Sequence, residues 1–154
     1  MAGIAAQAIP VVADTQMFRC MACDNSSIQE KTNDFINTFL AKYDEGGIMP
    51  IWDLSGNYTG CMIGYHAVPV IADAYLKGIR NYDVDKAFKA MKHSAIQDKL
   101  GLDSYKNLGY IPVEMESESV SKTLEYAYDD WTIAQMAKEM NNKFVVINKN
   151  RKKS

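Results

Sequence analysis

The sequence predicts an all-α fold, because apolar residues recur at helical spacing over several long stretches. Glycine, proline and polar residues punctuate the segments between these stretches, as expected of loops. About four main helices are expected, at residues 30–45, 63–79, 83–100 and 119–140. The loops 46–62 and 101–118 are longer than the roughly 2–8 residues usual in a helical bundle. Helix pairs joined by such loops favour a helical toroid over a simple bundle.

The first and third helices carry clear start and stop signals. Phe35, Ile36 and Phe39 share one face of the first helix, and Gly46 lies at its expected end. The third helix begins after Asp83, an N-cap residue type, and no acidic residue follows at the position that would complete a capping box.

The second and fourth helices depart from a regular amphipathic pattern. Pro69 falls inside residues 63–79, so we expect either a kink there or a helix that starts just before Pro69. The fourth helix has apolar residues over most of its circumference, including Val120, Leu124 and Trp131. Such a helix is expected to be buried in a larger body.

Composition sets limits on function. The chain has 154 residues, 47% hydrophobic and 23% charged, which is enough for one globular domain. A net charge of -2 provides no basic surface for nucleic acid or an anionic membrane, and no apolar run approaches the roughly 18–20 residues that span a bilayer. Cys20 and Cys23 have C-x-x-C spacing without a second ligand pair at zinc-site spacing.

Candidate binding residues gather in the loop 46–62. Trp52, Asp53 and Asn57 combine an aromatic face with carboxylate and amide oxygens, which is how proteins bind the apolar face and the hydroxyls of a sugar. The alternative is structural: a core Trp beside a capping Asp, and an Asn that serves a turn.

Further candidates lie at His66 and on the fourth helix. His66 could donate to a sugar hydroxyl or orient a carboxylate, or it could be structural. Glu125 and Asp129 share a helix face, with Asp130 beside them. Carboxylates so close together must line a wet cavity, bind a cation or meet basic partners. Two hypotheses therefore stand for these three carboxylates: they line a pocket, or they pair with Arg or Lys from another helix.

Five motifs, in order and at matching spacing, resemble glycoside hydrolase family 92, the calcium-dependent exo-acting α-mannosidases. They lie at residues 49–54, 60–66, 69–75, 109–112 and 119–131, and they read MPIWDL, GCMIGYH, PVIADAY, GYIP and SVSKTLEYAYDDW. The resemblance covers residues 31–140. It implies part of an (α/α)6 toroid and inverting hydrolysis of terminal α-mannosides, with α-1,2 linkages favoured. The candidate substrate-binding residues are therefore Trp52, Asp53, Asn57, His66, Glu125, Asp129 and Asp130. The resemblance mainly favours Trp52 and Asp53, and the other candidates follow from the residue patterns above.

The resemblance also implies what this chain does not contain. The catalytic acid and base of the family lie C-terminal to the matching motifs, so we predict no catalytic residue in this chain and no activity for the chain alone. The calcium ligands are likewise expected outside it. Residues 1–28 are expected to be a non-matching segment, 29–143 a partial catalytic domain and 144–154 a basic disordered tail. A truncated or frame-shifted reading of a larger gene would produce this pattern.

The expected partners are α-mannoside glycans and the remainder of the same catalytic domain, without nucleic acid or membrane. Members of the family are usually periplasmic or extracellular. Two alternatives of another class stay open: a non-catalytic helical scaffold, and a mannose-binding module without turnover.

Overall fold

The computed structural model describes residues 26–54, 57–59 and 62–140 and confirms an all-α fold. Within these ranges lie α2 (Ser26–Gly46), α3 (Ala67–Leu76), α4 (Val84–Ile96), α5 (Leu102–Leu108) and α6 (Ser119–Glu139). The strands β1 (Asp53–Leu54) and β2 (Asn57–Tyr58) form a minimal antiparallel hairpin that pairs Asp53 with Tyr58 and Leu54 with Asn57. The expected segment 1–28 and tail 144–154 lie almost wholly outside the described residues.

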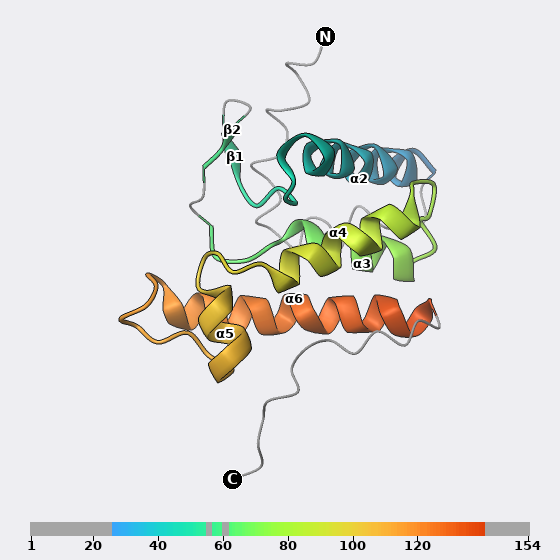
Figure 1. Cartoon of the computed structure of the whole chain (residues 1–154). Coiled ribbons are helices and arrows are strands. Elements are labelled where there is room, and N and C mark those ends of the chain that lie inside the picture. The colour runs from blue at the N-terminus through green and yellow to red at the C-terminus, as the bar shows by residue number, and fades with distance from the viewer. Residues whose placement is uncertain (1–25, 55–56, 60–61, 141–154) are drawn as a thin grey trace.

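The helices stack in three layers, with α2 above, α3 and α4 between, and α6 below (Figure 1). α3 packs chiefly against α6, and α2 contacts both α3 and α4. Each layer contributes side chains that are entirely buried, among them Phe39 of α2, Ile71 of α3 and Ile133 of α6. Figure 1 also shows α5 lying across one end of α6. No helix in the described ranges is long and apolar enough to cross a membrane.

Two predicted helix starts are confirmed. α3 begins at Ala67, so Pro69 falls in the first turn, where a missing backbone N–H removes no helical hydrogen bond. The expectation of a start just before Pro69 is therefore correct, and the start at residue 63 is wrong. The carboxylate of Asp83 accepts a 2.9 Å hydrogen bond from the backbone N–H of Lys86, which caps α4.

The predicted loops contain more regular structure than expected. The interval 101–118 holds α5, and the interval 46–62 holds the hairpin. α4 ends at Ile96, not at residue 100, and Gly101 precedes α5 with a φ of 79°. A Cβ on Gly101 would lie 2.9 Å from Cδ1 of Ile111, so this glycine allows a left-handed turn and a close contact together. Gly101 therefore precedes the short helix α5. The sequence pattern had indicated that it ends the third helix.

Candidate functional site

The candidate site lies where α3 begins, against the middle of α6. The turn 64–66 that leads into α3 brings His66 to α6, where Glu125 and Asp129 occupy one face, one helical turn apart. One ligand atom from each of these three side chains lies within 4.8 Å of the others. Residues about 60 positions apart in the sequence thus form one cluster, which we call the His66 cluster.

Tyr65 connects the turn to both aspartates of α6. Its backbone N–H donates to Oδ2 of Asp129 at 2.9 Å, and its hydroxyl donates to Oδ1 of Asp130 at 2.8 Å. Its ring stacks on that of Tyr126, with the centroids 5.3 Å apart. Burial, reinforced by the two carboxylates, raises the pKa of Tyr65 far above its usual range, so the phenol keeps its proton and remains a donor.

Gly64 makes room for the cluster. A Cβ at this position would lie 2.9 Å from Cε1 of His66, 3.1 Å from Oδ2 of Asp129 and 3.2 Å from Cβ of Glu125. These distances are shorter than ordinary carbon contacts, so a larger residue would displace the side chains. The absence of a side chain at Gly64 is therefore part of the geometry of the site.

Asp129 is the most deeply placed of the acidic residues, with no exposed surface. Burial raises its pKa well above the ordinary value; the Tyr65 N–H opposes this shift, while Glu125 and Asp130 add to it. Its other oxygen, Oδ1, is buried and has no hydrogen-bond partner among the described residues. A buried polar atom without a partner is costly, so Oδ1 needs a group to bind.

Asp130 lies beside the cluster and is hydrogen-bonded to the side chains of Tyr65 and Tyr105. Burial raises the pKa of Asp130 to about 6, although hydrogen bonds from Tyr65 and Tyr105 hold it lower than burial alone would. Both Asp129 and Asp130 accept hydrogen bonds from a tyrosine, through its backbone amide or its hydroxyl. The alternative prediction was that these carboxylates pair with Arg or Lys. Among the described residues, the hydrogen-bond partner of both aspartates is a tyrosine instead.

His66 and Glu125 form the outer part of the cluster. Nδ1 of His66 lies 3.9 Å from Oε2 of Glu125, and the Glu125 side chain is 36% exposed while that of His66 is 9% exposed. Burial lowers the pKa of His66, and the nearby Glu125 opposes that shift. The imidazole is therefore neutral near pH 7, with one ring nitrogen able to accept a hydrogen bond or to bind a cation. Solvent reaches the cluster from the Glu125 side.

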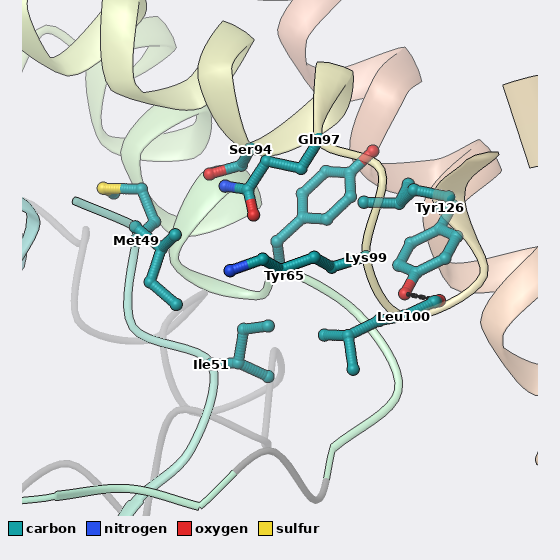
Figure 2. Close-up of a pocket in the computed structure, with 10 residues that line it drawn as sticks. Met49, Ile51, Tyr65, Ser94, Gln97, Lys99, Leu100 and Tyr126 are labelled. Carbon is teal, nitrogen blue, oxygen red and sulfur yellow. Dashed lines mark hydrogen bonds between the residues drawn. The ribbon is translucent and has the colours of Figure 1, made fainter. Parts of the chain in front are cut away.

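A separate cavity is lined in part by Tyr65 and Tyr126. It has a volume of about 210 Å³. Figure 2 shows Tyr65 and Tyr126 along its wall, with Met49 and Ile51 opposite. The hydroxyl of Tyr126 is already used by the carbonyl of Leu100, at 2.8 Å. This cavity offers mainly apolar surface, and the residues that line it include no cluster of acidic or histidine side chains.

The structure separates the predicted site residues into two groups. His66, Glu125, Asp129 and Asp130 come together between α3 and α6. Trp52 lies at the base of the hairpin, where its carbonyl accepts from the N–H and the hydroxyl of Thr59 at 3.1 and 2.9 Å. The hairpin of Asp53 and Asn57 projects from the helical layers (Figure 1). Trp52 is partly buried.

Sequence reasoning missed Tyr65, Gly64 and Tyr105 as site residues. Tyr65 and Gly64 directly precede His66 in the sequence, so the Gly-Tyr-His order at a helix start was the available signal. Tyr105 lies on α5, in a stretch that the sequence pattern indicates as a loop, and its part in the site could not be inferred without that helix.

Calcium, which the family resemblance implies, does not fit this cluster. Ca²⁺ takes about 6–8 oxygen ligands, whereas the cluster offers two carboxylates and an imidazole nitrogen. Mixed nitrogen and carboxylate ligands suit zinc and similar divalent ions instead.

Comparison with known proteins identifies the family of this chain. The sequence model of the "Glycosyl hydrolase family 92 catalytic domain" matches residues 17–154, which extends past the expected bounds 29–143 at both ends. The chain therefore belongs to glycosyl hydrolase family 92. An "uncharacterized secreted glycosidase" of Arthroderma benhamiae is 31% identical over 122 residues, which cover 68% of this chain and 16% of that protein.

Solved structures of the same family are similar in fold. A family GH92 α-mannosidase from Bacteroides thetaiotaomicron, in complex with mannoimidazole, is 47% identical with a TM-score of 0.72 and covers 75% of this chain. A family GH92 inverting mannosidase from Bacteroides thetaiotaomicron VPI-5482 is 37% identical with a TM-score of 0.68 and covers 74%. The likeness agrees with the expectation that the chain forms part of an (α/α)6 toroid.

The matched region is a small part of each relative. This chain spans 16% of the length of the curated relative and 16% of each of these two solved chains. The prediction that it is a fragment of a family 92 catalytic domain is confirmed.

Proposed function

We propose that this chain supplies part of the substrate-binding wall of an exo-acting, inverting α-mannosidase that hydrolyses terminal α-mannosides of glycans, with preference for α-1,2 linkages. The observation that carries the proposal is the 47% identity to an α-mannosidase solved with mannoimidazole. A secreted relative supports an exported enzyme. We also propose that the calcium of such an enzyme is held outside this chain.

In the part of the binding site that this chain supplies, Glu125 and His66 are the residues that contact the sugar. Glu125 is open to solvent and can accept from a hydroxyl, and the neutral His66 beside it can donate or accept. Asp129 and Asp130 are buried and hold Tyr65, so they act on the substrate by positioning the turn that carries His66. The other predicted substrate residues lie at the hairpin, with Asp53 in β1, Asn57 in β2 and Trp52 directly before β1.

The chain alone is inactive under this proposal. An inverting glycosidase needs an acid that protonates the leaving oxygen and a base that activates water, with the two carboxyl groups roughly 6.5–9.5 Å apart. Glu125 and Asp129 lie closer than this, with atoms within 4.8 Å, and Asp129 has no access to solvent. They are placed to bind and orient, and the reacting pair belongs to the remainder of the catalytic domain.

The test is hydrolysis by the full-length protein that contains this chain. With calcium present, we expect release of mannose from α-1,2-mannobiose faster than from the α-1,3 and α-1,6 isomers. The first mannose detected by NMR should be the β-anomer. Release of the α-anomer would refute inversion, and hydrolysis of none of these substrates would favour the scaffold or mannose-binding alternatives.

A further inference from the structure

We propose that the His66 cluster binds a divalent cation of the zinc class, held by His66, Glu125 and Asp129. Three side chains from two elements bring one nitrogen and two carboxylate groups within 4.8 Å of one another. This is the composition of many three-ligand zinc sites, in which a fourth position is left for water or substrate.

The distance between the ligand atoms of His66 and Glu125 is slightly longer than in an occupied zinc site. Ligand atoms at about 2.0–2.2 Å from one tetrahedral zinc lie roughly 3.3–3.6 Å apart. Nδ1 of His66 and Oε2 of Glu125 are 3.9 Å apart, so rotation of the partly exposed Glu125 side chain is enough to bring them to this separation. Glu125 is the adjustable ligand and also the side from which an ion would enter.

A second, independent observation comes from Asp129. Its Oδ1 is buried without a partner among the described residues, while Oδ2 is fixed by the Tyr65 N–H. Protonation would not remove the problem, because a buried hydroxyl also needs an acceptor. A cation supplies the missing partner and compensates the charge of two carboxylates that lie side by side. The Tyr65 amide then holds the metal-bound carboxylate in its orientation from behind.

The polarity of the surroundings fits a cation. The charged and titratable groups that face Asp129 are Glu125, Asp130 and the buried His66, with the protonated Tyr65 between them. Lys122, which is buried on the same helix, is already paired with Glu116 at 2.9 Å. In the described part of the chain, carboxyl groups therefore outnumber cationic groups around Asp129, and such an arrangement suits a divalent ion.

The test is zinc binding by the 154-residue chain in a Cys20→Ser/Cys23→Ser background, which removes the C-x-x-C thiols as competing ligands. After treatment with a chelator, titration calorimetry should show a single Zn²⁺ per chain, and excess Ca²⁺ should not displace it. Co²⁺ should give the visible absorption of a tetrahedral site without thiolate bands. Because no sugar is present, this result is independent of mannosidase activity.

Three variants locate the ion. Glu125→Gln keeps the shape of a partly exposed side chain, and it should weaken Zn²⁺ binding about 10–100-fold without changing the circular dichroism spectrum. His66→Gln should do the same. Glu139→Gln, which changes an exposed carboxylate near the end of the same helix, is the matched control and should bind as the parent does. A helical parent that does not bind Zn²⁺, or equal binding by Glu125→Gln and the parent, would overturn the proposal.

Discussion

At the scale of single residues, Tyr65 organises the site by holding two neighbouring aspartates with two different groups. Sequence alone indicated His66 and the three acidic residues as candidates, because their types and the i, i+4 spacing on one helix are visible. The proximity of His66 to Glu125 could not be predicted from the sequence, because it depends on how α3 packs on α6. The unpartnered Oδ1 of Asp129 is likewise a property of packing.

The buried aspartates should make stability depend on pH. Asp130 has a pKa of about 6 in the folded chain, against an ordinary value of about 4, so its folded form binds the proton more tightly. The proton on Asp130 contributes roughly 3 kcal/mol to the free energy of unfolding. This contribution is fully present below about pH 4 and is lost as the pH rises through 6. Asp129 acts in the same direction.

Urea denaturation between about pH 4 and 7, with chelator present, measures this dependence. Asp130→Asn retains an acceptor for Tyr65 but has no proton to lose, so its free energy of unfolding should fall less steeply than that of the parent. Asp98→Asn, at an exposed residue, should follow the parent. Parallel slopes for the parent and Asp130→Asn would contradict the assignment.

The close packing at Gly64 gives a second prediction. Gly64→Ala should destabilise the chain by about 1–3 kcal/mol, because the added Cβ meets His66, Asp129 and Glu125 at 2.9–3.2 Å. Gly46→Ala is the control, since it lies at the end of α2 with nothing within 4 Å and should be neutral or slightly stabilising. Equal effects of the two substitutions in thermal unfolding would show that the contact around Gly64 is not tight.

At the scale of the elements, the starts of α3 and α4 could be predicted from local chemistry, whereas the start of α2 and the short elements could not. Asp83 and Pro69 act through local chemistry, a cap and a missing N–H, and both positions follow from the sequence. α5 has only seven residues between glycines with positive φ, so it shows no periodicity. It depends on tertiary contacts, such as the edge-on packing of Tyr105 against Tyr126.

The cap of α4 can be tested directly. Asp83→Ala removes the acceptor for the Lys86 N–H and should cost about 1 kcal/mol of unfolding free energy. Asp83→Asn keeps an acceptor and should retain most of the stability. If both variants unfold at the denaturant concentration of the parent, the cap contributes nothing measurable.

At the scale of the whole molecule, α6 has one face in the core and another in solvent. Asp129, Tyr126 and Ile133 are buried, whereas Val120, Leu124 and Trp131 are 72%, 67% and 57% exposed. The sequence pattern predicts a helix surrounded on most sides by a larger body. The exposed stripe fits that expectation in a chain that spans 16% of the length of its solved relatives. An apolar stripe of this kind is unusual on a complete monomer.

Self-association should follow from this stripe. In sedimentation velocity the chain is expected to form oligomers, and Val120→Gln/Leu124→Gln should shift it towards monomer because two exposed apolar side chains are removed. The matched control is Val113→Gln/Met115→Gln, which removes two similarly exposed residues outside the stripe. A monomeric parent, or equal effects of the two pairs, would show that the stripe is not an adhesive surface.

Under the proposed function, this chain is a working part of an α-mannosidase and is not an enzyme by itself. The most direct measurement places residues 31–140 in the Bacteroides thetaiotaomicron α-mannosidase, in exchange for the matching segment, and compares this chimera with the isolated chain on an aryl α-mannoside with calcium. We predict hydrolysis by the chimera and none by the chain. Turnover by the isolated chain, or a cooperatively folded chimera without activity, would contradict the claim.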